Sequence, residues 1–139
     1  MKTKKSITTL LIVFGLWSAL IFGCKSSTQK TSDAANAITI SAQDLYKAYE
    51  SSEADADKLY QGKILIVTGP VGDTDTPGAG RPAVTLLAQK SPAIQCFGFA
   101  ADQKDAISKL KAGQSASVKG KCMGRMMGKL VVLEDSVLQ

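Results

Sequence analysis

The stretch Ile64-Leu-Ile-Val-Thr-Gly-Pro-Val71 decides the fold. Its residues are apolar and largely β-branched, and polar positions do not alternate with apolar ones, which predicts a strand buried on both faces. Gly69 lies inside this stretch, and a glycine within a strand permits a sharp bend. We therefore expect a central strand that can turn sharply at Gly69.

Four further strands are predicted downstream of this one. Residues 115–122 alternate strictly, which is typical of a half-buried strand. The residues predicted to face inward there are Ala116, Val118, Gly120 and Cys122. The other strands are expected at 82–87, 93–99 and 129–137, separated by a loop at 72–81 and a turn at 123–128.

Two helical regions complete the pattern. Ser41 and Ser52 each precede an acidic residue by three positions, which is a helix-start signal. They predict two short helices, or one bent helix, over 41–60. A second apolar stripe over 101–112 ends before Gly113, a residue suited to the position after a helix.

The order of these elements predicts a fold of the α+β class that is mainly β. A bendable first strand and a helix between the third and fourth strands match the five-stranded OB-fold barrel, here with N-terminal helices. A five-stranded antiparallel sandwich is the alternative. The chain has 139 residues, which suits one domain, placed at 38–139.

The N-terminal segment has the organisation of a secretory signal. Lys2, Lys4 and Lys5 precede the apolar run 7–22, whose 16 residues fall short of a membrane-spanning helix, which needs about 20. Gly23-Cys24 follows directly and resembles a bacterial lipobox. That resemblance implies that residues 1–23 are a signal peptide, cleaved before Cys24, and that Cys24 is lipidated. An uncleaved anchor and an ordinary signal peptide are the alternatives.

Residues 24–37 are small, polar and unpatterned, which predicts a flexible tether behind the lipidated cysteine. We therefore expect a protein of the bacterial cell envelope, attached to the membrane through its N-terminal lipid. Because Lys25 is not aspartate, the outer membrane, on its periplasmic side, is favoured if the organism is Gram-negative.

The net charge of +5 comes mostly from the signal segment. Without residues 1–23, 14 basic residues face 12 acidic ones, a net charge of +2. From Ile38 onward, 12 basic residues face 11 acidic ones. The high overall pI is therefore weak support for a nucleic-acid partner.

Several short stretches together resemble the tRNA_anti-like group of bacterial OB-fold proteins. They are Ser41-Ala-Gln-Asp-Leu-Tyr-Lys-Ala-Tyr49, Ala56-Asp-Lys-Leu-Tyr-Gln-Gly-Lys63, Val67-Thr-Gly-Pro-Val71, Ile94-Gln-Cys-Phe97 and Val118-Lys-Gly-Lys-Cys122. The resemblance covers about 38–139. It implies the OB fold and carries over no functional residue, because the group has no established activity.

Cysteine usage leads to a structural hypothesis. Lipidation of Cys24 leaves Cys96 and Cys122, a pair that is readily oxidised outside the cytoplasm. Both fall on faces assigned to the core. We predict a disulfide that closes a loop of about 27 residues and contributes roughly 3–4 kcal/mol. Two buried thiols packed as small apolar groups are the alternative.

The composition argues against an enzyme. The chain contains no histidine, the side chain best suited to proton transfer near neutral pH, so Ser-His and Cys-His arrangements are excluded. The carboxylates Glu50, Glu53, Asp55 and Asp57 cluster on the leading helices, where solvated faces normally carry them. We expect no enzymatic activity and no cofactor.

The segment Cys122-Met-Gly-Arg-Met-Met-Gly128 is rich in sulfur, which suits Cu(I) and raises a soft-metal carrier as a third hypothesis. Such sites usually include histidine, however, and a disulfide would remove the thiolate. We therefore assign no metal ligands, and expect Met126 and Met127 to fill one end of the barrel.

An oligonucleotide-binding domain is the second hypothesis. Seven basic residues between Lys104 and Lys129 face only Asp105, and Phe97 and Phe99 could stack on bases. Two residues argue against nucleic-acid binding. Asp73 and Asp75 would repel phosphate at the position where OB folds usually bind nucleic-acid strands. Nucleic acid is therefore not the expected partner.

The favoured function is a non-enzymatic binding or adaptor module whose partner is an unknown envelope protein or a small ligand. OB barrels usually bind ligands on the second and third strands and the adjoining loops. The candidate ligand face comprises Asp73, Asp75, Arg81, Thr85, Gln95, Lys121 and Arg125.

Overall fold

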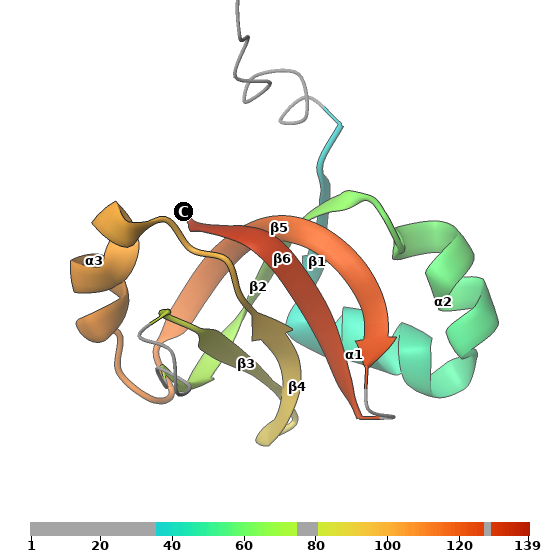
Figure 1. The fold of residues 1–139 in the computed structure, drawn as a ribbon. Coiled ribbons are helices and arrows are strands. Elements are labelled where there is room, and N and C mark those ends of the chain that lie inside the picture. Colours follow the sequence, from blue (N-terminus) through green and yellow to red (C-terminus); the bar gives the residue numbers. More distant parts are fainter. Residues whose placement is uncertain (1–35, 75–80, 127–128) are drawn as a thin grey trace, which may run out of the picture.

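The computed structural model describes residues 36–74, 81–126 and 129–139. Its elements along the chain are β1 (Ile38–Ser41), α1 (Ala42–Ser51), α2 (Glu53–Tyr60), β2 (Ile64–Asp73), β3 (Val84–Ala88), β4 (Ser91–Cys96), the 3-10 turn η1 (Ala101–Gln103), α3 (Lys104–Ser108), β5 (Ser115–Met126) and β6 (Leu130–Leu138) (Figure 1). Cys24 and Asp75 lie outside the described residues. In the described part of the chain, no helix has the length and apolar character needed to cross a membrane.

The strands form a closed barrel, which confirms the predicted OB-like fold. Their order is β1-β2-β3-β4-β6-β5, and β5 returns to pair with β2. This pair closes β2 to β6 into a ring, with β1 outside it, whereas the alternative sandwich would have two separate layers. The predicted five strands correspond to β2 to β6, with α3 between the third and fourth of them.

Strand β1 is an addition that we did not predict. It runs parallel to the first half of β2, with Ile38 beside Leu65 and Ser41 beside Thr68. Because β5 pairs with β2 from Ile64 to Pro70, β1 lies along the opposite edge of β2. Strand β3 takes over that edge beyond the glycine-proline step, where Val71 pairs with Leu86.

Gly69 marks the point where the partner of β2 changes from β1 to β3. A Cβ atom at this position would lie 2.7 Å from the Cβ atom of Ala42, the first residue of α1. Such a distance is well inside van der Waals contact, so only glycine lets α1 start this close to β2. Pro70 stays in the ladder opposite Ser115.

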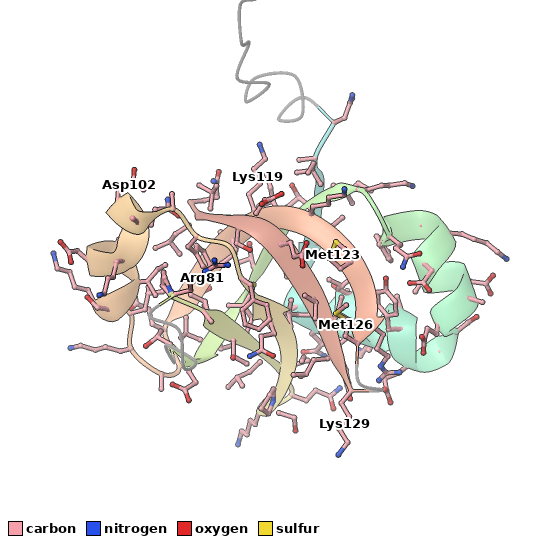
Figure 2. The ribbon with its side chains drawn as sticks, in the orientation of Figure 1. Arg81, Asp102, Lys119, Met123, Met126 and Lys129 are labelled. Atoms are coloured by element: carbon pink, nitrogen blue, oxygen red, sulfur yellow. The ribbon has the colours of Figure 1, made fainter. Side chains whose placement is uncertain are left out.

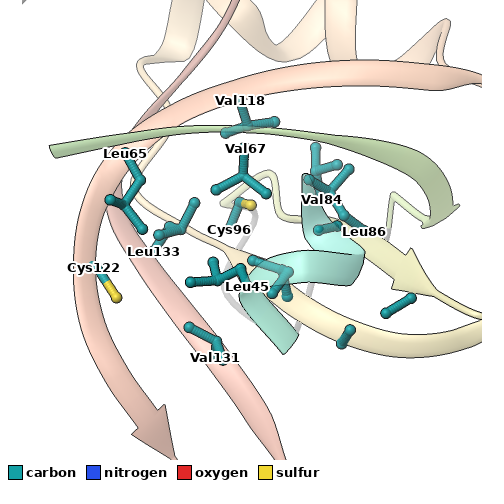
Figure 3. Close-up of a cluster of buried hydrophobic side chains, with 14 of the residues drawn as sticks. Leu45, Leu65, Val67, Val84, Leu86, Cys96, Val118, Cys122, Val131 and Leu133 are labelled. Carbon is teal, nitrogen blue, oxygen red and sulfur yellow. The ribbon is translucent and has the colours of Figure 1, made fainter. Parts of the chain in front are cut away.

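Both leading helices begin at the predicted serines. The Ser41 side chain accepts a hydrogen bond from the Asp44 amide at 3.0 Å, and Ser52 accepts one from Asp55 at 3.4 Å. These caps supply acceptors for amides that lack a partner in the first helical turn. Two short helices are therefore confirmed, and Leu45 of α1 projects into the core (Figure 3).

The core is built from the inner faces of the strands together with α1. Its largest fully buried side chains include Leu65, Val67, Leu86, Val118 and Leu133 (Figure 3). The inward positions predicted for 115–122 are all buried, so that alternation is confirmed. Every member of the core cluster lies between residues 42 and 133.

Several element boundaries differ from the prediction; the strand expected at 93–99, for example, is β4 at Ser91–Cys96. Helix α3 ends at Ser108 rather than at 112, because the Gly113 amide bonds to the Val71 carbonyl at 2.7 Å and leads the chain into β5. Strand β5 continues to Met126, where we predicted a turn. A register shift between Cys122 and Gly124 accommodates an extra residue, so pairing with β6 continues past it.

Candidate functional site

Three of the predicted ligand-face residues form a polar row across neighbouring strands. Asp73 on β2 pairs with Thr85 on β3, which pairs in turn with Gln95 on β4. Asp73 is exposed, and the other two are partly buried. Their neighbours Val84, Leu86 and Ile94 point into the core, so the row lies on the outer face of the barrel. It presents a carboxylate, a hydroxyl and an amide.

The other predicted residues are not gathered onto this row. Arg81 is exposed in the segment leading to β3. Lys121 pairs with Ile64, at the opposite end of β2 from Asp73, and with Glu134 on β6. The structure thus divides the predicted ligand face between two parts of the barrel.

Arg125 is occupied by α1 instead of facing a ligand. Its guanidinium forms an ion pair with Glu50, lies 5.7 Å from the centre of the Tyr46 ring and donates to the Tyr49 carbonyl at 3.4 Å. Only 12% of the side chain is exposed. Because these three contacts all join the guanidinium to α1, we assign Arg125 to the attachment of β5 to α1, although its buried Nε has no hydrogen-bond partner among the described residues.

The predicted disulfide between Cys96 and Cys122 is wrong: both thiols are free and buried. Cys96 on β4 and Cys122 on β5 each pair with Leu133, because β6 runs between their strands. Figure 3 shows the two sulfurs on either side of that leucine. Two strand spacings separate the Cα atoms by about 9–10 Å, beyond the roughly 7 Å that a disulfide can bridge.

A partly buried polar cluster that sequence reasoning missed joins the helices to β5. The Tyr49 hydroxyl donates to the Asp57 carboxylate at 3.0 Å and lies 3.6 Å from the Cys122 sulfur. The Gln61 side chain donates to the Met123 carbonyl at 3.2 Å. Gly124, with φ +88°, leaves room for the side chains of Asp57 on α2 and of Gln61 just after it, because a Cβ there would lie 3.0 Å from Asp57 and 2.9 Å from Gln61.

The chemistry of this cluster is that of a structural clamp. Burial, reinforced by Cys122 and Asp57, raises the pKa of Tyr49, and burial also raises the pKa of the Cys122 thiol. Both groups therefore keep their protons at neutral pH and are poor nucleophiles. The spacing of Asp57 and Gln61 on one helix face is visible in the sequence, but their partners on β5 are not.

A polar hollow of about 420 Å³ opens where β1 gives way to β3 along β2. Ser41, Asp44, Thr68 and Gln89 contribute to its walls. Much of its hydrogen-bonding capacity is already used: Ser41 donates to the Asp44 carboxylate at 2.7 Å, and Thr68 bonds Ser117 at 2.7 Å. The Ser41 and Thr68 hydroxyls are therefore already engaged within the protein.

The sulfur-rich segment does not have the expected arrangement. Met126 is 47% exposed and does not fill an end of the barrel, and Met127 lies outside the described residues. Met126 and Met123 are drawn in Figure 2. Among the residues that the structure describes, no three histidine, cysteine or acidic side chains are grouped as metal ligands would be.

The fold and outer face define an OB-like barrel of the kind that binds ligands on its sheet surface. The family model tRNA_anti-like matches residues 1–137, and the chain belongs to this family. A lipoprotein from Klebsiella pneumoniae, to which nucleic-acid binding is ascribed, has a similar crystal structure. The TM-score is 0.59 at 18% identity, covering 76% of this chain and 94% of that one. Comparison of the sequence with curated proteins gave no match.

Proposed function

We propose that this protein is a lipid-anchored, non-enzymatic binding module of the bacterial envelope. The observation that carries the binding role is the continuous row of Asp73, Thr85 and Gln95 on the outer face of the barrel. Its hydrogen-bonding groups suit a polar, uncharged or cationic ligand, such as an extended peptide segment. The lipobox at Gly23-Cys24 and the similarity to a lipoprotein support attachment to a membrane.

Site-specific crosslinking in the native envelope tests this role. A photoreactive residue at Thr85 should capture a defined neighbour, whereas the same group at exposed Ala54 on α2 should not. Substitution of Gln95 by alanine should reduce capture, because it removes the adjacent amide. Identical products from both positions would argue against a specific face. Acylation is tested separately by the mass of the N-terminal peptide.

Oligonucleotide binding is the second candidate, favoured by the nucleic-acid binding ascribed to the similar Klebsiella lipoprotein. Lys119 and Lys121 on β5 would supply the phosphate contacts. If these two lysines neutralised two phosphates, affinity for single-stranded DNA would fall roughly 7-fold between 50 and 200 mM salt. An anisotropy titration at low salt that detects no complex would remove this candidate.

A further inference from the structure

Charge is divided between two sides of the domain. Strands β1 and β5 and the first seven residues of β2 contain no aspartate or glutamate. Helices α1 and α2 carry five acidic residues and only two lysines. The outer surface of β1, β2 and β5 therefore repels an anionic surface less than the helices α1 and α2 do.

The residues on this surface combine basic and aliphatic side chains. Ile66 lies between Thr39 on β1 and Lys119 on β5, and Ile64 lies beside Lys121. Lys63 is exposed at the adjoining rim, where its carbonyl bonds the Cys122 amide. Glu134 opposes Lys121 from β6 and offsets one of the three positive charges.

The chain outside the described structure ends on this same surface. It enters at β1, whose Thr39 shares a row with Lys119, and Figure 2 shows Lys119 on the side where β1 begins. If the tether predicted from the sequence for residues 24–37 is a flexible chain, its 14 residues span about 20 Å on average. A lipid on Cys24 would thus hold this surface closer to the bilayer than the acidic helices.

We propose that the surface of Thr39, Ile64, Ile66, Lys119 and Lys121, with Lys63 at its rim, docks onto anionic phospholipid headgroups. This docking rests on the lipid attachment proposed above, because the attached lipid keeps the domain close to the membrane. The lysines contact phosphate while their stems and the isoleucines approach the interface. This orientation turns the hairpin between β3 and β4 away from the membrane (Figure 1).

Quenching in proteoliposomes tests the orientation with the full acylated chain. A fluorophore is placed on Thr39→Cys or, as the distal position, on Ser91→Cys, and lipids carry a quencher on their headgroups. Cys96 and Cys122 are buried and do not compete for label. In vesicles containing phosphatidylglycerol, quenching should be stronger at position 39 than at 91. In phosphatidylcholine alone, this difference should shrink.

The double variant Lys119→Glu with Lys121→Glu should reduce the difference at least to that seen in phosphatidylcholine, because each lysine contributes a factor of about five to membrane association. The matched control Lys104→Glu with Lys109→Glu changes the charge equally at two exposed positions, at the start of α3 and just after its end, and should retain the difference. Circular dichroism verifies that both variants fold. Equal quenching at the two positions, or equal effects of the two variants, would overturn the proposal.

Two further arms separate this proposal from its alternatives. Single-stranded DNA binding that is lost only in the Lys119/Lys121 variant, without a difference in quenching, would assign the surface to nucleic acid and overturn lipid docking. If mass spectrometry finds no lipid on Cys24, the proposed attachment fails. Sedimentation of that chain with phosphatidylglycerol vesicles then tests docking alone: binding sensitive to the two lysines supports it, and absence of binding overturns it.

Discussion

Replacing Gly69 with alanine should destabilise the domain by forcing β2 and α1 apart. The new methyl carbon would lie 2.7 Å from the Ala42 Cβ atom, whereas carbon atoms pack best at about 3.5–4.0 Å. Neither atom belongs to a flexible side chain, so about 1 Å of backbone movement is required. Overpacking of this kind costs about 1–3 kcal/mol.

The partner substitution Ala42→Gly makes this prediction specific. On its own it should cost about 2 kcal/mol, from one buried methyl group and the lower helix propensity of glycine. Combined with Gly69→Ala, it removes the clash, so the double variant should be more stable than the sum of the two single effects by about 1–3 kcal/mol. Ala54→Gly, at an exposed helix position, measures the propensity contribution alone.

Urea unfolding followed by far-ultraviolet circular dichroism gives the four free energies of the cycle. The chain without residues 1–24 is suitable, because the core cluster lies entirely between residues 42 and 133. A Gly69→Ala variant within about 0.5 kcal/mol of the parent would refute the close approach as the reason for this glycine. So would a double variant whose destabilisation equals the sum of the two single effects.

Three other predictions follow from the described contacts. Burial raises the pKa of Cys96 to about 12, above the value near 9 in the unfolded chain. The contribution of this thiol to stability is therefore complete below pH 9, and the free energy of unfolding falls by about 1.4 kcal/mol per pH unit above pH 9. This fall should be less steep in Cys96→Ala, and an unchanged slope of unfolding free energy against pH would contradict the raised pKa of Cys96. Tyr49→Phe removes the donor to Asp57 and should cost about 1–2 kcal/mol in urea unfolding, whereas no loss would show that the clamp is not stabilising. The Gln103 side chain accepts a hydrogen bond from the Leu138 amide at 3.0 Å and donates one to the Leu138 carbonyl at 3.4 Å. Gln103→Ala should therefore accelerate hydrogen exchange of the Leu138 amide at the end of β6. An unaltered exchange rate would show that Gln103 does not protect this amide.

Local patterns predicted the elements that depend on neighbouring residues. The alternation of 115–122 identified the buried face of β5, and the serine caps located both leading helices, because each signal is complete within a few positions. Strand β1 escaped detection since four residues give too short a pattern. Its existence depends on the edge of β2 left open beside α1.

The site was harder to predict because it depends on which strands are neighbours. The polar row requires the register of Asp73, Thr85 and Gln95, which no local pattern contains. The disulfide prediction failed for the same reason: inward-facing cysteines near strand ends gave no indication that β6 separates them. Arg125 was assigned to a ligand because its partners belong to α1, 75 positions away at Glu50.

The parallel pairing of β1 with β2 also determines how the domain responds to mechanical load. Traction on the chain ahead of Ile38 is directed along β1, so the ladder hydrogen bonds resist it together in shear rather than opening one by one. Under sufficient force these four residues would detach from β2 first. Their detachment would lengthen the N-terminal connection before the closed ring of strands is strained. The released edge of β2, from Leu65 to Thr68, would then lie open for another strand to occupy.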